Sequence, residues 1–97
     1  MTAATPPVEV DFDPAGAWRR ARSVALRPEP FGALLYHFGT RKLSFLKNLT
    51  VVDIVQSLHD HDTAESTLVA ADIDEAQRPL YLQALTALAD SGMIIRR

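Results

Sequence analysis

The feature that most constrains the fold of this chain is a pair of apolar segments joined by a very short polar link. Residues 33–38 read ALLYHF, residues 43–46 read LSFL, and only GTRK lies between them. Two such runs with a glycine at the start of the link predict an antiparallel β-hairpin. If Gly39-Thr40 forms a two-residue type II′ turn, the strands span 33–38 and 41–46. The predicted pairs are then Phe38 with Arg41, Tyr36 with Leu43, and Leu34 with Phe45.

This register sorts the side chains of the hairpin onto two faces, because alternate residues of a strand point to opposite sides of a sheet. One face collects four large apolar side chains, whereas the other pairs Leu35 with Ser44 and His37 with Lys42. A three-residue loop would mix Tyr36 with Ser44, which makes that register less favourable. We therefore predict that the first face packs against the helices. Its residues are Leu34, Tyr36, Leu43 and Phe45, and the predicted helical partners are Val51, Ile54, Val55, Leu58, Leu85 and Leu88.

Another strand is predicted just before the hairpin, over residues 23–27, where the sequence alternates with a period of two. Pro28 and Pro30 end it, because proline fixes φ and has no N–H to donate to a neighbouring strand. The two sides of this strand hold Val24 with Leu26 and Ala25 with Arg27.

After Asn48 the apolar period becomes helical. Thr50 is a candidate N-cap with Asp53 three residues later, and an apolar stripe follows at helical spacing. A second helix is predicted from after Thr63 to about Ala71. A third helix follows the capping-box spacing of Asp72 and Glu75, begins near Pro79 or bends there, and stops at Ser91-Gly92. The stripe of the first helix consists of Val51, Ile54, Val55 and Leu58.

The predicted order is therefore three antiparallel strands and then three helices, an α+β domain with the helices on one face of a small sheet. A length of 97 residues predicts a single domain. Residues 1–17 are rich in alanine and proline without any periodicity, which predicts a flexible N-terminal arm before a domain at 18–97. Trp18 stands at this boundary, and the position is more typical of a residue that covers the core than of a docking anchor.

The composition excludes several classes of protein. The chain has no cysteine, which excludes disulfides, a thiol nucleophile and a cysteine-bound iron–sulfur cluster made by this chain alone. The longest apolar run, at 33–36, is far too short to cross a membrane. The N-terminal residues lack the basic and apolar regions of a signal peptide, so we expect a cytoplasmic protein.

The charge is unevenly distributed along the chain. Residues 1–48 carry seven basic and four acidic side chains, a balance of +3, and residues 49–97 carry three and eight, a balance of −5. A winged-helix regulator that reads DNA with its third helix is the alternative function. The region before that helix is acidic, however, and offers only Arg78 as a phosphate contact. This distribution argues against nucleic acid as the partner.

Neither a metal site nor an active site is predicted. His59-Asp60-His61-Asp62 contains metal-ligand residue types, but it lies at the end of the first helix, where exposed polar residues are common. The sequence has no motif that joins a nucleophile to a base, no glycine-rich phosphate loop and no HExxH. We therefore predict a binding module without catalytic residues, metal or cofactor.

The last strand of the sheet indicates what such a module could bind. In a three-stranded meander this strand is left at the edge unless the C-terminal tail covers it. Adding an extended peptide to an exposed edge strand is an established mode of recognition. Residues 42–47 are the predicted place for such a strand.

The stretch ALRPEPFGALLYHFGTRKLSFLKN resembles the peptide chaperones of mycofactocin biosynthesis, a group of PqqD-like RiPP recognition elements. The resemblance runs from about Trp18 to Ile95 and is most specific in RPEPFG and YHFGTR, at 27–32 and 36–41. It implies a winged-helix-like, PqqD-like peptide-binding domain without catalysis of its own. Such proteins bind the leader of a ribosomally made precursor peptide and present it to a radical S-adenosylmethionine (SAM) maturase, which here serves the biosynthesis of a redox cofactor.

The resemblance also implies that the peptide lies between the third strand and the third helix. The alternation of the sequence then selects the contacting residues, and the cations among them favour an acidic leader. The alternative explanation for these cations is that they keep an edge strand soluble. The candidate peptide site consists of Arg41, Lys42, Leu43, Ser44, Phe45, Leu46, Lys47, Tyr81, Leu82 and Leu85.

Overall fold

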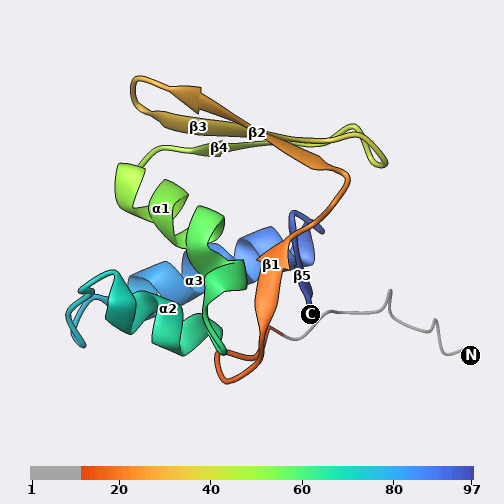
Figure 1. Cartoon of the computed structure of the whole chain (residues 1–97). Coiled ribbons are helices and arrows are strands. Elements are labelled where there is room, and N and C mark those ends of the chain that lie inside the picture. Colours follow the sequence, from red (N-terminus) through yellow and green to blue (C-terminus); the bar gives the residue numbers. More distant parts are fainter. Residues whose placement is uncertain (1–11) are drawn as a thin grey trace, which may run out of the picture.

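The structure, a computed structural model, describes residues 12–97, so most of the predicted N-terminal arm lies outside the described residues. It confirms the α+β class, with a three-stranded antiparallel sheet followed by three helices (Figure 1). The elements are β1 (Trp18–Arg20), β2 (Val24–Glu29), β3 (Gly32–His37), β4 (Leu43–Leu46), α1 (Leu49–Ser57), the 3₁₀ turn η1 (Leu58–Asp60), α2 (Ala64–Ala70), α3 (Arg78–Asp90) and β5 (Ile94–Arg96).

Two separate sheets form, although the sequence predicted only one. The larger sheet has the order β2-β3-β4, and its β3–β4 register is the predicted one, with Tyr36 opposite Leu43 and Leu34 opposite Phe45. The second sheet pairs β1 with β5, so that Trp18 lies opposite Arg96. In Figure 1 the larger sheet forms the top layer and the helices lie beneath it, with the β1–β5 ribbon at the side. The C-terminal segment therefore does not cover β4.

The turn of the hairpin differs from the predicted type II′ turn. Gly39 does not have the positive φ that such a turn needs, whereas Arg41 has a φ of 61°. The ring nitrogen Nδ1 of His37 accepts hydrogen bonds from the backbone N–H groups of Gly39 and Thr40, at 3.0 and 3.1 Å. The imidazole thus holds a four-residue turn, residues 38–41, which keeps the same register between the strands.

The prediction of which face of the sheet meets the helices was wrong. Leu35 is completely buried against the helices, together with Ala33 and Leu46, whereas Phe45 is 57% exposed. The reason lies in β2, where Leu26 pairs with Leu35 and Arg27 pairs with Leu34. Packing Leu34 inward would also carry the Arg27 guanidinium inward, at a high desolvation cost. The face that turns away from the helices contains Leu34, Tyr36, Leu43 and Phe45.

This orientation predicts opposite results for two alanine substitutions in paired strands. Leu35→Ala should lower the free energy of unfolding by about 2–5 kcal/mol, because it leaves a cavity in the core. Phe45→Ala should lower it by less than about 1 kcal/mol, because more than half of the ring is already in water. Urea denaturation of the two variants measures both quantities. A larger loss for Phe45→Ala than for Leu35→Ala would contradict the orientation.

The helices begin and end at residues with capping functions. Asn48, and not Thr50 as predicted, caps α1, since its side-chain oxygen accepts from the N–H groups of Thr50 and Val51. Thr63 caps α2, which begins directly after it, as predicted. The helix α3 begins at Arg78 with Pro79 in its first turn, where proline is tolerated, and Gly92 with a φ of 77° follows its end. Asp72 has a positive φ before α3 and is not its cap.

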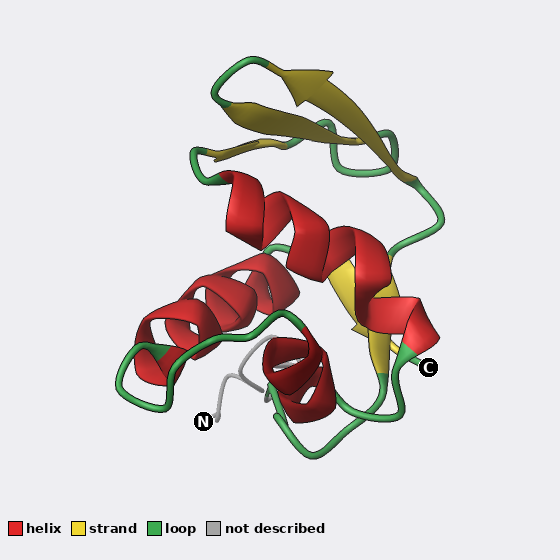
Figure 2. Cartoon of the chain, turned by 60° about the vertical axis from the view of Figure 1, so that its left-hand side comes forward, coloured by secondary structure: helices red, strands yellow, loops and turns green. Residues whose placement is uncertain are grey.

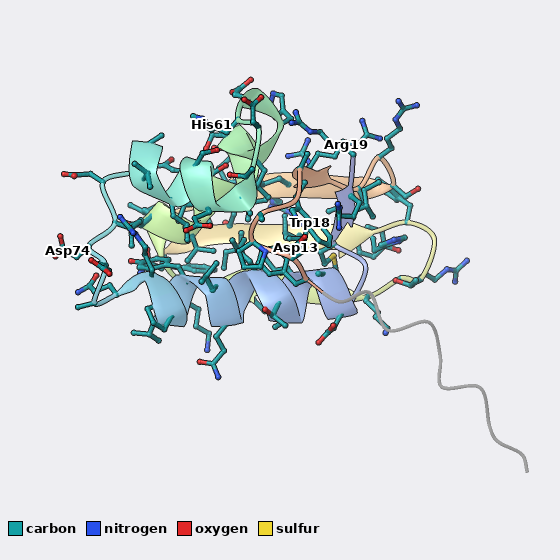
Figure 3. The ribbon with its side chains drawn as sticks, turned by 90° about the horizontal axis from the view of Figure 1, so that it is seen from below. Asp13, Trp18, Arg19, His61 and Asp74 are labelled. Atoms are coloured by element: carbon teal, nitrogen blue, oxygen red, sulfur yellow. The ribbon has the colours of Figure 1, made fainter. Side chains whose placement is uncertain are left out.

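The core lies between the sheet and the three helices, and Trp18 seals one side of it. Its side chain is fully buried, and its indole N–H donates to the carbonyl oxygen of Asp13 at 2.8 Å. In Figure 3, Asp13 and Trp18 lie next to each other in the middle of the view. The carbonyls of Pro14 and Gly16 accept from the first N–H groups of α2, which ties residues 12–17 to the domain. None of the helices in residues 12–97 has the length and apolar character to cross a bilayer.

Candidate functional site

The strand β4 is an edge strand whose outer side is unpaired within the described part of the chain. Its backbone orientation follows from the hydrogen bond that His37 N–H donates to the carbonyl of Lys42 at 3.0 Å. Because such pairs alternate in an antiparallel ladder, Ser44 and Leu46 also direct their backbone groups to β3. Leu43 and Phe45 therefore direct their N–H and C=O groups away from the sheet. These groups are available to one further strand.

The side chains of β4 are divided between the two faces of the sheet. Leu46 is buried among the helices, and Ser44 on the same face is half-buried. Leu43 and Phe45, which are 55% and 57% exposed, point away from the helices. The prediction that both lie in a groove with the third helix was wrong. Leu43 and Phe45 lie at the free edge but on the opposite face from α3.

A hollow of about 380 Å³ lies between the start of α1, which directly follows β4, and the first half of α3. Of the three residues predicted on this helix, Tyr81 lines the hollow, Leu82 is half-buried outside its lining, and Leu85 is only 1% exposed and belongs to the core. Leu80 and Ala84 were not predicted, although their spacing with Gln77 indicates one face of a helix. The lining consists of Asn48, Val51, Gln77, Leu80, Tyr81 and Ala84.

Positively charged side chains flank the free edge at both of its ends. Arg41, Lys42 and Lys47 are all exposed at the two ends of β4. The ion pairs found among residues 12–97 involve other cations, namely Arg27, His59 and Arg96. The three cations at the edge therefore have no carboxylate partner in the described structure, and they are free to meet an acidic ligand.

Two further groups of polar side chains lie near α1. His59 and Asp60 approach to 3.2 Å, but both side chains are more than 60% exposed. Residues 12–97 contain no group of three or more histidine and acidic side chains that could hold a metal ion. A hollow of about 560 Å³ next to α1 has a polar lining that includes Asp53, Ser57 and His61. These residues offer hydrogen bonds but no arrangement of nucleophile and base.

Comparison with known proteins finds peptide chaperones among the relatives of this chain. The model of the peptide chaperone MftB family matches residues 17–95. A peptide chaperone MftB from Mycolicibacterium smegmatis is 58% identical over 90% of this chain and 85% of its own length. Those from Mycobacterium ulcerans and Mycobacterium tuberculosis are 56% and 53% identical, over 87% and 90% of this chain and 77% and 80% of their own lengths. Among solved structures, none matches the chain significantly.

Proposed function

The chain belongs to the peptide chaperone MftB family, and from this premise we propose that it binds the leader of a ribosomally made precursor peptide. It then presents the peptide to a radical SAM maturase of mycofactocin biosynthesis in the cytoplasm. The family is one of peptide chaperones and not of enzymes, so the chemistry belongs to the partner.

The observation that carries this proposal is the unpaired edge of β4. An antiparallel leader strand would accept from the N–H groups of Leu43 and Phe45 and donate to their carbonyls. Backbone pairing of this kind supplies affinity without reading the sequence of the peptide. The side chains next to the edge must therefore supply the specificity.

Two sets of peptide side chains would meet different surroundings, because a strand alternates between the two faces of a sheet. One set points to the helix side, where the end of β4 adjoins the hollow lined by Leu80 and Tyr81. The other set points to the outer side, next to Leu43 and Phe45. The unpaired cations at both ends of β4 favour carboxylates in the leader and increase its association rate. A leader with apolar and acidic residues fits this site.

An NMR titration of the labelled chain with the precursor peptide encoded beside it tests the proposal. We expect amide shifts to cluster at residues 42–47 and at 77–84, where the edge and the hollow lie. Resonances of β1 and β5 serve as the internal control, because this ribbon is a separate sheet. Shifts confined to the second half of α1, residues 54–57, or to residues 24–27 would contradict the site. Absence of binding at millimolar peptide would contradict the function itself.

No observation favours the alternative of a DNA-binding regulator. The third helix, which would enter the major groove, begins with Arg78, and this is its only basic residue. Asp90 ends the same helix, and Asp74 and Glu75 precede it. A helix with so little positive charge gains little from contacts with phosphate groups.

A further inference from the structure

We propose that the face of the β2-β3-β4 sheet that turns away from the helices is the docking surface for the enzyme that receives the peptide. This outer face consists of Ala25, Arg27, Leu34, Tyr36, Leu43 and Phe45, with Phe31 and Phe38 at its two ends. The inference rests on the proposed function, since it names the surface that meets the second partner of the chaperone.

The apolar side chains of the outer face form one continuous band. Leu34 lies opposite Phe45, and Tyr36 lies opposite Leu43. Phe31 extends the band at one end, with its ring centroid 6.4 Å from that of Phe45. At the other end, the rings of Tyr36 and Phe38 meet edge to face at 5.0 Å. The band therefore spans the whole length of the hairpin.

The large apolar side chains of this band are exposed to solvent. Phe31, Phe38, Leu43 and Phe45 are each between 50% and 63% exposed. In Figures 1 and 2 the helices lie on the opposite side of the sheet, and no described element covers the outer face. A contiguous apolar surface of this kind on a small domain is typical of a protein–protein interface.

The bound leader is too narrow to cover this surface. Neighbouring strands lie about 4.8 Å apart, so a strand added to β4 would be about 10 Å from β3 and about 14 Å from β2. Its outward side chains would contact Leu43 and Phe45 but would leave Phe31, Leu34 and Tyr36 largely uncovered. The rest of the outer face must therefore be covered by a partner wider than a single strand, namely a folded protein.

The charges at the border of the outer face select an acidic protein and disfavour a second copy of this chain. Arg27 lies on the face itself and pairs with Glu29 at 3.5 Å, and Arg41, Lys42 and Lys47 flank β4 without an ion pair among residues 12–97. A symmetric pair of outer faces would bring these cations together, and like charges across an interface are costly. An apolar patch bordered by aspartate and glutamate would complement the face.

The position of the outer face explains how one small domain can hold two partners at once. Leu43 and Phe45 belong both to this face and to the edge that pairs with the leader. An enzyme seated on the outer face would therefore also contact the outward side chains of the bound peptide. Each partner should strengthen the binding of the other, because the contact between them exists only in the ternary complex.

The double variant Ala25→Glu/Arg27→Glu tests this assignment. Both substitutions lie on β2, two strands away from the free edge, at exposed positions. The control is Ala70→Glu, which places a new carboxylate at an exposed position of α2, away from the outer face. Biolayer interferometry with the radical SAM enzyme and with the precursor peptide, each encoded beside this chain, measures the two affinities separately. Sedimentation velocity reports self-association, and flotation with phosphatidylglycerol vesicles reports membrane binding.

We expect the double variant to bind the enzyme at least about tenfold more weakly and to bind the peptide within about twofold of the original chain. The control should match the original chain in both. Unchanged affinity for the enzyme, with peptide binding intact, would overturn the docking surface alone. A dimer or vesicle binding that the double variant abolishes would assign the face to a second copy or to a lipid surface instead. Absence of binding to both peptide and enzyme in the original chain would overturn the proposed function and this inference together.

Discussion

Leu43→Pro should weaken the binding of the precursor peptide about 10- to 100-fold while the domain stays folded. The N–H of Leu43 points to the free edge and takes no part in the ladder with β3. Proline removes this donor and leaves a peptide carbonyl without a partner, which costs about 1–3 kcal/mol. Leu43 is also the first residue of β4, a position where proline is compatible with a strand. Isothermal titration calorimetry with the precursor peptide measures the loss.

Two further variants separate the backbone from the side chain. Leu43→Ala keeps the N–H, so peptide affinity should change by less than about fivefold. Ser44→Pro removes a donor that faces β3, so it should damage the fold and appear in thermal unfolding rather than in peptide binding alone. Wild-type affinity in a folded Leu43→Pro protein would show that the leader does not pair with β4.

The hairpin shows that its local sequence can predict the register between two strands but not which face of the sheet is buried. Register depends on neighbours along the chain, and alternation over 33–46 was sufficient to predict it. The choice of inner face depends on a third strand, and the decisive residue is Arg27 in β2. Both faces of the hairpin contain large apolar side chains, so the hairpin alone predicted the wrong one. Alternation in residues 23–27 carried the missing information, because it sets Leu26 and Arg27 on opposite sides.

The β1–β5 ribbon shows a second limit of the local pattern. Each strand has only three residues, and more than 70 residues separate them along the chain. So short a segment has no measurable period, and only the burial of Trp18 was predictable from residue type. The pairing depends on the packing of α3, which brings Ile94 back beside Arg20. Such long-range contacts leave almost no local signal.

The candidate site was predictable where it depends on strand order and not where it depends on helix rotation. A third strand without a fourth must present a free edge, and β4 does so. The face that α3 turns to the hollow depends on its packing angle. Apolar spacing alone could not separate Leu85, which is buried in the core, from Leu80 and Ala84, which line the hollow.

Gly32→Ala should lower the free energy of unfolding by about 3 kcal/mol or more, a large part of the stability of a small domain. A methyl group on this residue would lie 1.8 Å from the carbonyl oxygen of Leu46. That oxygen belongs to the backbone of β4 and cannot rotate away. Shifting it would break the pairing of Leu46 with Ala33 at the end of the ladder. Thermal unfolding followed by circular dichroism should show a midpoint about 12 °C lower, or more.

Gly16→Ala is the control, because a methyl group there would also clash, but with a flexible side chain instead of the backbone. A methyl group there would lie 2.8 Å from the guanidinium carbon of Arg96. This side chain is half exposed and flexible, so it can move aside, and we expect a loss below about 1 kcal/mol. A Gly32→Ala midpoint within about 3 °C of the control would contradict the close approach of β4 to Gly32. The glycine of the RPEPFG segment is thus predicted to be required because the backbone of β4 passes directly over it.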